Sequence, residues 1–218
     1  MPQSDLVFSS QHVQKVSEEM QAVSQSYEAL FTDLGEQILR DIDQEERDSQ
    51  QVQITLKQIE QALEAFSAYF PSNDKVACQK GCGHCCVFPV KTPPQFIPFI
   101  ADHIKTTRSD EEIAALKVKM QQNIEERQPP LYRALCPLID NESACSIYEH
   151  RPLACRLFTS PDVQLCLKSV ADGSSVSQQP IRYRVYQSAT VALQAQLKKN
   201  NKPYEQIDFI PALLAELT

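Results

Sequence analysis

The chain has 218 residues, enough for one domain of ordinary size with a helical appendage, and its 42% apolar and 22% charged residues allow a globular core. Its net charge of −7 argues against nucleic acid as a partner, and no apolar run approaches the ~20 residues of a membrane helix. The chain start lacks the basic residues and apolar stretch of a secretory signal, so we expect a cytoplasmic protein without a membrane partner.

Charge and cysteine are unevenly distributed along the chain. Residues 1–70 hold 13 acidic and 4 basic residues, whereas residues 71–218 hold 15 acidic and 17 basic residues. All eight cysteines lie between Cys78 and Cys166. The distribution predicts three parts: an acidic N-terminal helical hairpin (1–72), a cysteine-cluster metal-binding domain (73–175) and C-terminal helices that pack on the core (176–218).

Two apolar seams predict that the N-terminal part is an antiparallel pair of amphipathic helices. We favour the interpretation that both seams are buried against each other and against the core. The alternative is a coiled-coil-like surface for a protein partner or for a second copy of the chain. The first seam comprises Val13, Val16, Met20, Val23, Tyr27, Leu30 and Leu34, extended by Ile38 and Ile42; the second comprises Val52, Leu56, Ile59, Leu63, Phe66 and Phe70 and ends at Pro71.

Further helices are predicted after the first cysteines. Thr92 is a candidate N-cap with Pro93 at the first helical position, followed by an apolar face that comprises Phe96, Ile97, Phe99, Ile100 and Ile104. Ser109 and Glu112 form a candidate capping box for the next helix. In the C-terminal tail, the sequence predicts helices over residues 181–197 and 211–217. We find no alternation of strands and helices, so the predicted fold class is mainly α, with an irregular, loop-rich cysteine-cluster core.

The first cysteine group lies within the nine residues Cys78-Gln-Lys-Gly-Cys82-Gly-His-Cys85-Cys86. Four sulfurs this close in sequence can converge only if the backbone turns sharply, and Gly81 and Gly83 tolerate the positive φ angles that such turns use. Cys85 and Cys86 are adjacent, so an extended backbone would point their side chains to opposite sides. One of the two would then serve a different metal or support the site from outside.

The second group is dispersed, and three interpretations of the cysteines compete. Disulfides need an oxidising compartment, and nothing in the sequence exports the chain. Buried cysteines that act as small apolar side chains would not cluster in this way. We therefore favour metal ligation, because thiolates are soft ligands that suit zinc or iron–sulfur centres. The predicted metal ligands are Cys78, Cys82, Cys85, Cys86, Cys136, Cys145, Cys155 and Cys166.

Other residues near the cysteines have both structural and functional interpretations. His84 lies inside the first motif and is a candidate zinc ligand. For Arg151 and Arg156 we favour a structural role, in which the guanidinium groups hold their loop through carbonyl groups, over anion binding. Basic residues that could offset thiolate charge are Lys80, Arg133, Arg151, Arg156 and Lys168.

Both cysteine blocks together resemble a known family. The run CQKGCGHCC fits a CxxxCxxCC motif, and CPLIDNESACSIYEHRPLACRLF fits a second block with a Cys-Pro start and an Arg-Pro-x-x-Cys-Arg end. The sequence is similar to the YkgJ-type cysteine-cluster family, described as a zinc- or iron-chelating domain, over roughly Cys78 to Cys166. The resemblance implies a metal-centre fold and says little about a reaction. A flagellin lysine methylase carries this domain, which implies a link to protein methylation.

The sequence therefore predicts a metal-binding cysteine-cluster protein with a structural, redox or metal-handling role. Its cofactor would be zinc or iron, with a [4Fe–4S] cluster as one form of iron. The alternative is an iron–sulfur enzyme or accessory factor related to protein lysine methylation. Cys78, Cys82 and Cys85 have the spacing of radical S-adenosylmethionine enzymes, but the chain is too short and too helical for their βα barrel. The sequence leaves open whether the protein is an enzyme.

Overall fold

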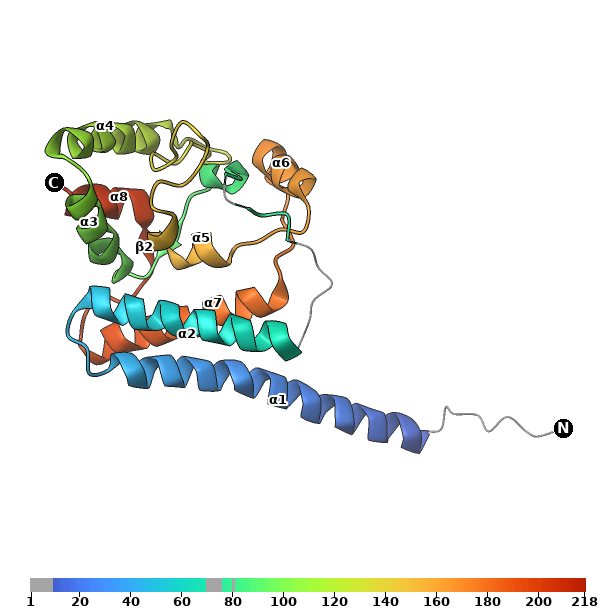
Figure 1. The fold of residues 1–218 in the computed structure, drawn as a ribbon. Helices are drawn as coiled ribbons and strands as arrows, with labels where there is room; N and C mark the ends of the chain where they lie inside the picture. The colour runs from blue at the N-terminus through green and yellow to red at the C-terminus, as the bar shows by residue number, and fades with distance from the viewer. Residues whose placement is uncertain (1–9, 70–75, 80) are drawn as a thin grey trace.

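The computed structural model describes residues 10–69, 76–79 and 81–218 (Figure 1). The described part is built from α-helices with one antiparallel pair of two-residue strands, so the predicted mainly α class is confirmed. Within it, no helix combines the length and the apolar character needed to cross a membrane. The elements are α1 (Ser10–Ile42), α2 (Asp48–Tyr69), η1 (His84–Val87), β1 (Lys91–Thr92), α3 (Phe96–Thr107), α4 (Asp110–Glu126), η2 (Tyr148–His150), α5 (Leu153–Leu157), α6 (Val163–Asp172), α7 (Pro180–Lys199), β2 (Ile207–Asp208) and α8 (Phe209–Glu216).

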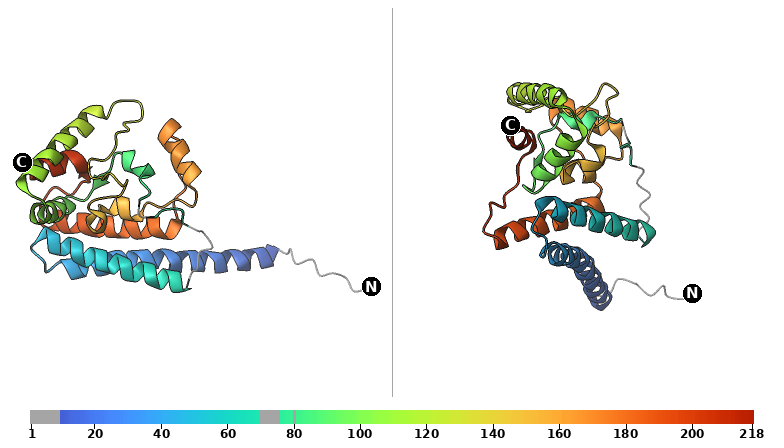
Figure 2. Two further views of the ribbon diagram at one scale, coloured as in Figure 1. Left: turned by 45° about the horizontal axis from the view of Figure 1, so that its top comes forward. Right: turned by 60° about the vertical axis from the view of Figure 1, so that its left-hand side comes forward.

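The two predicted N-terminal helices form, and α7 joins them. Helix α1 lies along both α2 and α7, and α2 and α7 separate it from the cysteine-bearing half of the molecule (Figures 1 and 2). The second seam is buried as predicted at Val52, Leu56 and Ile59. Phe70 and Pro71, which we expected to end this seam, lie outside the described residues. The division of the chain into three parts stays a prediction, because the contacts of α7 with α1 do not test it.

The first seam is buried only along its C-terminal half. Ile38 and Ile42 are fully buried, and Phe31 is buried in place of the expected Leu30, which is 47% exposed. The expectation that the whole seam is buried is wrong for its N-terminal half, where Met20 and Val23 are 69% and 70% exposed. The reason is helix length: α1 has 33 residues, whereas α2 and α7 have 22 and 20 and end before they reach its start.

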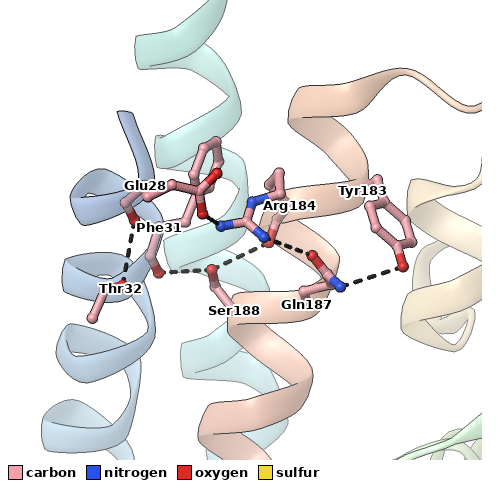
Figure 3. A network of polar contacts seen from close by, with 7 residues as sticks. All are labelled: Glu28, Phe31, Thr32, Tyr183, Arg184, Gln187 and Ser188. Atoms are coloured by element: carbon pink, nitrogen blue, oxygen red, sulfur yellow. Dashed lines mark hydrogen bonds and ion pairs between the residues drawn. The ribbon is translucent and has the colours of Figure 1, made fainter. Parts of the chain in front are cut away.

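Polar contacts fix α1 against α7 beside the buried seam (Figure 3). The Ser188 hydroxyl of α7 donates a 2.7 Å hydrogen bond to the Phe31 carbonyl of α1. The Arg184 guanidinium lies over the Phe31 ring and forms an ion pair with Glu28. Gly35 lies at the contact of the two helices, where an added Cβ atom would lie 3.4 Å from the Ser188 carbonyl oxygen, an ordinary contact distance. These contacts set the position of α7, which carries one wall residue of the site described below.

The start of α3 differs from the sequence prediction. Thr92 does not cap the helix; it lies in β1 and pairs with Ile207 of β2, and Phe96 begins the helix after a turn that Pro93 and Pro94 form. The predicted apolar face of α3 is buried, as expected. The predicted start is wrong because Thr92 precedes Pro93, which favours an extended backbone at Thr92, and the strand pair with Ile207 uses that extended backbone.

The remaining predicted helices are present. The Ser109–Glu112 capping box of α4 is confirmed, with both reciprocal hydrogen bonds formed. Helix α7 covers the predicted residues 181–197 and begins at Pro180, and α8 begins at Phe209, two residues before its predicted start. The cysteine region, expected to be irregular, contains the short helices α5 and α6 as well.

A matched pair of Val→Ala substitutions tests where the core lies. Val52 of α2 is fully buried, whereas Val118 of α4 is 58% exposed. We expect Val52→Ala to lower the free energy of unfolding by about 2 kcal/mol, because two buried methyl groups are lost and a cavity remains. Val118→Ala should change it by less than about 0.5 kcal/mol. Urea denaturation measures both values, and equal effects would contradict the described packing of α2.

Two histidines stack where η2 meets α3. The ring centres of His103 and His150 lie 3.7 Å apart with an angle of 9° between the rings, and the Phe99 ring also stacks on His150, with the ring centres 5.0 Å apart. Burial lowers the pKa of both histidines, and Arg108 lowers that of His103 further. For His150, the cations His103 and Arg156 also lower the pKa, while Glu149 opposes them. The folded state therefore favours two neutral rings.

The stack predicts a loss of stability in mild acid. Below the ordinary histidine pKa of about 6.5 the unfolded chain binds more protons than the folded chain, so stability falls as pH falls. We expect His150→Phe, which keeps a ring on Phe99 and removes the charge, to reduce the fall in Tm between about pH 7.5 and about pH 5.5. His12→Gln, on the exposed part of α1, is the control and should not reduce it. An unchanged acid response in His150→Phe would show that the stack does not cause it.

Candidate metal centre

All eight cysteines line one cavity of about 390 Å³. They are free thiols, and each except the buried Cys166 is partly accessible. The thiols come from separate segments, namely the loop before η1, η1 itself, the loop after α4, α5 and α6. The structure thus brings together the two groups that the sequence separates by the whole of α3 and α4.

The segment before η1 places Cys78 and Cys82. The Ala77 N–H donates to the Ser160 carbonyl (2.9 Å), and the Ser160 N–H donates to the Cys78 sulfur (3.3 Å), which ties this segment to the loop before α6. A turn follows, in which the Cys82 N–H donates a hydrogen bond to the Gln79 carbonyl. Gly81 has the expected positive φ of 88°, but Lys80, a predicted charge partner, lies outside the described residues.

Gly83 and the neighbouring cysteines differ from the sequence prediction. Gly83 has φ of −94° rather than a positive value, and it precedes the 3₁₀ turn η1. Because η1 is helical rather than extended, the opposed side chains expected of an extended backbone do not apply to Cys85 and Cys86, and Cys86 is the first cause of the raised pKa of Cys85. An added Cβ atom at Gly83 would lie 3.4 Å from the Ser143 carbonyl oxygen, an ordinary contact distance, so Gly83 lies beside the loop that carries Cys145.

Backbone hydrogen bonds join the second cysteine group to η1. The Cys136 N–H donates to the Cys86 carbonyl (2.7 Å), and the Ala134 N–H donates to the Val87 carbonyl (3.2 Å). From Cys136 the chain turns back to Cys145, which forms an isolated bridge with Ile139. The Asp140 carboxylate holds this turn, since it accepts two backbone N–H groups at 2.9 Å.

Helices supply the last two thiols. Cys155 lies on α5, which packs on α7, and Cys166 lies on α6, which packs on η1 (Figure 1). Helix α6 begins at the Asp162 cap and ends at Gly173, whose positive φ of 79° terminates it. Sequence analysis expected loops here, although the Asp162 and Gly173 signals at the two ends of α6 could have revealed that helix.

The surroundings keep most of these thiols protonated in the absence of metal. Burial raises the pKa of Cys136 to about 11, and burial is also the first cause of the raised pKa of Cys78, Cys145 and Cys155. The hydrogen bond with Cys86 and then burial raise the pKa of Cys85. Ionised neighbouring thiols add to each shift, so the thiols interact electrostatically across the cavity.

Four arginines line the same cavity, and no described aspartate or glutamate does. Arg151 lowers the pKa of Cys85, Cys145 and Cys155, and its guanidinium lies 3.6 Å from the Tyr148 ring centre. The structural interpretation of Arg151 and Arg156 is confirmed, because both donate hydrogen bonds to carbonyl groups of their own loop. The other two arginines of the wall are Arg127 and Arg182.

Arg127 is the residue that sequence analysis missed. Its guanidinium donates to the carbonyl groups of Val87 and Phe88 after η1 and of Tyr132 and Ala134 before Cys136. It thereby joins the two cysteine groups and lowers the pKa of Cys136. The position of Arg127 directly after α4 gives no local signal of this role.

The other predicted neighbours divide into two sets. His84 lines the cavity, and its role as a ligand stays a prediction. Arg133 does not line the cavity: its guanidinium lies 4.2 Å from the Phe88 ring centre and donates to the Leu131 and Ser169 carbonyls. Lys168 is exposed on α6 and does not line the cavity either.

The donor set fits a soft metal, although the described sulfurs are not close enough together to hold one ion. Within the described residues, no three Cys, His, Asp or Glu side chains lie close enough together to hold one ion. Eight thiols around a cavity with four cations nevertheless match the chemistry of zinc or iron–sulfur centres, which carry negative charge when four thiolates surround them.

Comparison with known families agrees with this chemistry. Residues 77–175 match the family model CxxCxxCC, described as a "putative zinc- or iron-chelating domain". This chain has one residue more between its first two cysteines than the family name indicates. Comparisons with curated proteins and with solved structures give no match. The match supports the resemblance to this cysteine-cluster family over residues 77–175, which make up less than half of the chain.

Proposed function

We propose that this chain binds zinc or iron through its eight cysteines in the cavity described above. One observation carries the proposal: thiols from five separate segments line a single cavity, although the chain between them forms two long helices. Cysteines that served only as small apolar side chains would not need to face a common space. The match of residues 77–175 to a zinc- or iron-chelating family supports metal binding in general.

The composition of the wall favours a thiolate-bound metal over a hard cation. Magnesium and calcium prefer oxygen ligands, and no described carboxylate lines the cavity. Zinc and iron–sulfur clusters take thiolates, and four thiolates around a divalent ion leave a net negative charge. Arg127, Arg151, Arg156 and Arg182 offset that charge at short range.

The electrostatic neighbours of each thiol suggest two centres rather than one. The pKa of Cys78 responds to Cys82 and Cys166, whereas that of Cys155 responds to Cys136 and Cys145. Both sets respond to Cys85, which lies beside Cys86 in η1. If Cys85 and Cys86 each complete one set of three, the result is two sites with four thiolates each. That number of ligands suits tetrahedral zinc and suits [4Fe–4S] clusters equally.

A structural role follows from where the ligands lie. A metal that draws the sulfurs together would fix the loops that carry Cys78, Cys82, Cys136 and Cys145. These loops are held by single backbone hydrogen bonds rather than by long helices or a sheet. A redox role would require iron, and metal handling would require exchange. A link to protein lysine methylation, implied by the family resemblance, stays a prediction that no contact of the described residues supports.

Single cysteine substitutions test metal binding and the number of centres together. We expect two centres in the wild type and about half of the metal in Cys82→Ser and in Cys145→Ser, because each removes one of four thiolates from one site. Ser143→Ala, which alters the cavity wall without removing a thiol, is the control and should keep all of the metal. Elemental analysis of anaerobically purified protein, with visible absorbance for iron–sulfur clusters, gives the count.

Two outcomes of this experiment would contradict the proposal. Metal-free wild-type protein that takes up neither zinc nor iron would overturn metal binding itself. Complete loss of metal in both cysteine variants would overturn the two-centre arrangement and indicate one shared centre.

Arg127→Lys tests whether the two cysteine groups depend on one guanidinium. Lysine carries a compact ammonium and cannot donate to four carbonyl groups at once. We expect a loss of about 1–3 kcal/mol of stability, since partly buried carbonyls lose their donors, together with reduced metal content. The control is Arg40→Lys on α1, whose exposed side chain lies 3.6 Å from Glu36 and should matter little. Thermal unfolding and elemental analysis measure the two effects, and unchanged values in Arg127→Lys would contradict this role.

A further inference from the structure

The N-terminal half of α1 carries a continuous apolar surface that nothing in the described chain covers. Every described residue from Ser10 to Ser26 is exposed, and this part of α1 extends beyond the ends of α2 and α7 (Figures 1 and 2). We call the apolar row on this face the α1 stripe. It consists of Val13, Val16, Met20, Val23, Tyr27 and Leu30; all but the partly buried Tyr27 are between 38% and 70% exposed.

The spacing of the stripe is that of a helix–helix interface. Its residues alternate three and four apart over the whole row, which is the 3.5-residue repeat of a two-stranded coiled coil. The same row continues into Leu34, which packs on the buried core, so the interface of α1 with its own chain runs directly into the exposed stripe. A projecting helix of this length is only marginally stable in water by itself, and contiguous exposed apolar residues mark contact surfaces.

We propose that the α1 stripes of two copies of this chain pair antiparallel and form a dimer. A two-fold axis between Met20 and Val23 makes the stripe complementary to itself. Met20 then meets the second copy's Val23, Val16 meets its Tyr27, and Val13 meets its Leu30. Every stripe residue thus faces another stripe residue, with no polar residue placed in the seam.

The residues beside the stripe fit this arrangement. One flank carries Ser10, Ser17 and Ser24, whose small side chains allow two helices to approach closely. On the other flank the two-fold axis places Glu19 opposite the second copy's Ser26 and His12 opposite its Asp33. No two like charges therefore face each other across the seam.

Net charge favours the antiparallel over the parallel orientation. The part of each chain beyond the stripe, residues 31–218, holds 24 acidic and 20 basic residues and so carries a net charge of −4, and a parallel pair would place these two bodies side by side. The antiparallel pair places them at opposite ends of the stripe, whose 18 residues span roughly 27 Å at 1.5 Å per residue. That separation exceeds the Debye length of about 8 Å at physiological salt, so the repulsion is screened.

Charged substitutions in the full-length, metal-loaded protein test both the dimer and its orientation. We expect a wild-type dimer by light scattering and a monomer for Met20→Glu, because a carboxylate would then face the apolar Val23 of the second copy. Gln21→Glu, which adds the same charge outside the stripe, is the matched control and should stay dimeric. Circular dichroism and metal content should match the wild type in all variants, because the stripe lies outside the core and outside the cavity.

The double variant Met20→Glu, Val23→Lys distinguishes the two orientations. In the antiparallel pair each carboxylate at position 20 meets an ammonium at position 23, so the dimer should return. In a parallel pair each position meets its own copy, so like charges would face each other and the double variant should stay monomeric. A monomeric wild type or a dimeric Met20→Glu would overturn the proposal, and a monomeric double variant beside a dimeric wild type would overturn the antiparallel arrangement.

Discussion

One short contact region holds the two cysteine groups together, and the cavity depends on it. The Cys136 N–H donates to the Cys86 carbonyl at 2.7 Å, and the Arg127 guanidinium donates to carbonyl groups on both sides of this contact. Carbonyl groups in such a loop have no helix or sheet partners and would be costly to bury unpaired. One planar guanidinium with five donors satisfies four of them, which lysine cannot do. The positions of Cys136 and Cys145 relative to the first group follow from this contact, whereas the packing of α5 and α6 places Cys155 and Cys166.

The helices provide the frame on which that contact forms. The strand pair β1–β2 and the Phe209 N–H bond to the Val90 carbonyl fix the chain directly after η1, and α6 packs on η1 from the other side. Buried Gln95, at the start of α3, donates to the Leu193 carbonyl of α7 at 2.8 Å and so connects the two halves of the molecule. The cavity wall is therefore held from several directions by the packing of helices, while its own loops form few repeated backbone hydrogen bonds. A bound metal would add order to a region that the helices already confine.

Features set by neighbouring residues were predictable from the sequence, and features set by distant partners were not. The Ser109–Glu112 capping box depends on residues three apart, and the cysteine motif is local, so both could be recognised. The seam of α2 has a buried partner along most of its length and was predicted correctly. The seam of α1 has the same periodicity at Met20 as at Ile38, and only the lengths of α2 and α7 decide which part is covered. Arg127 likewise acts on carbonyls up to 40 residues away, and no periodicity reveals that.

The uneven distribution of charge along the chain agrees with where the cavity lies in the structure. Thiolates need cations nearby and carboxylates far away, because a carboxylate beside them would oppose their ionisation. The excess of acidic over basic residues lies in residues 1–70, and α2 and α7 separate α1 from the cavity, whose wall carries arginines. Burial alone would keep the thiols neutral, as the pKa of about 11 for Cys136 shows. A metal supplies the positive charge that reverses this preference, and the arginines lower the remaining cost. The excess of acidic over basic residues in residues 1–70 therefore accounts for the net negative charge of the chain, while no described carboxylate lines the cavity.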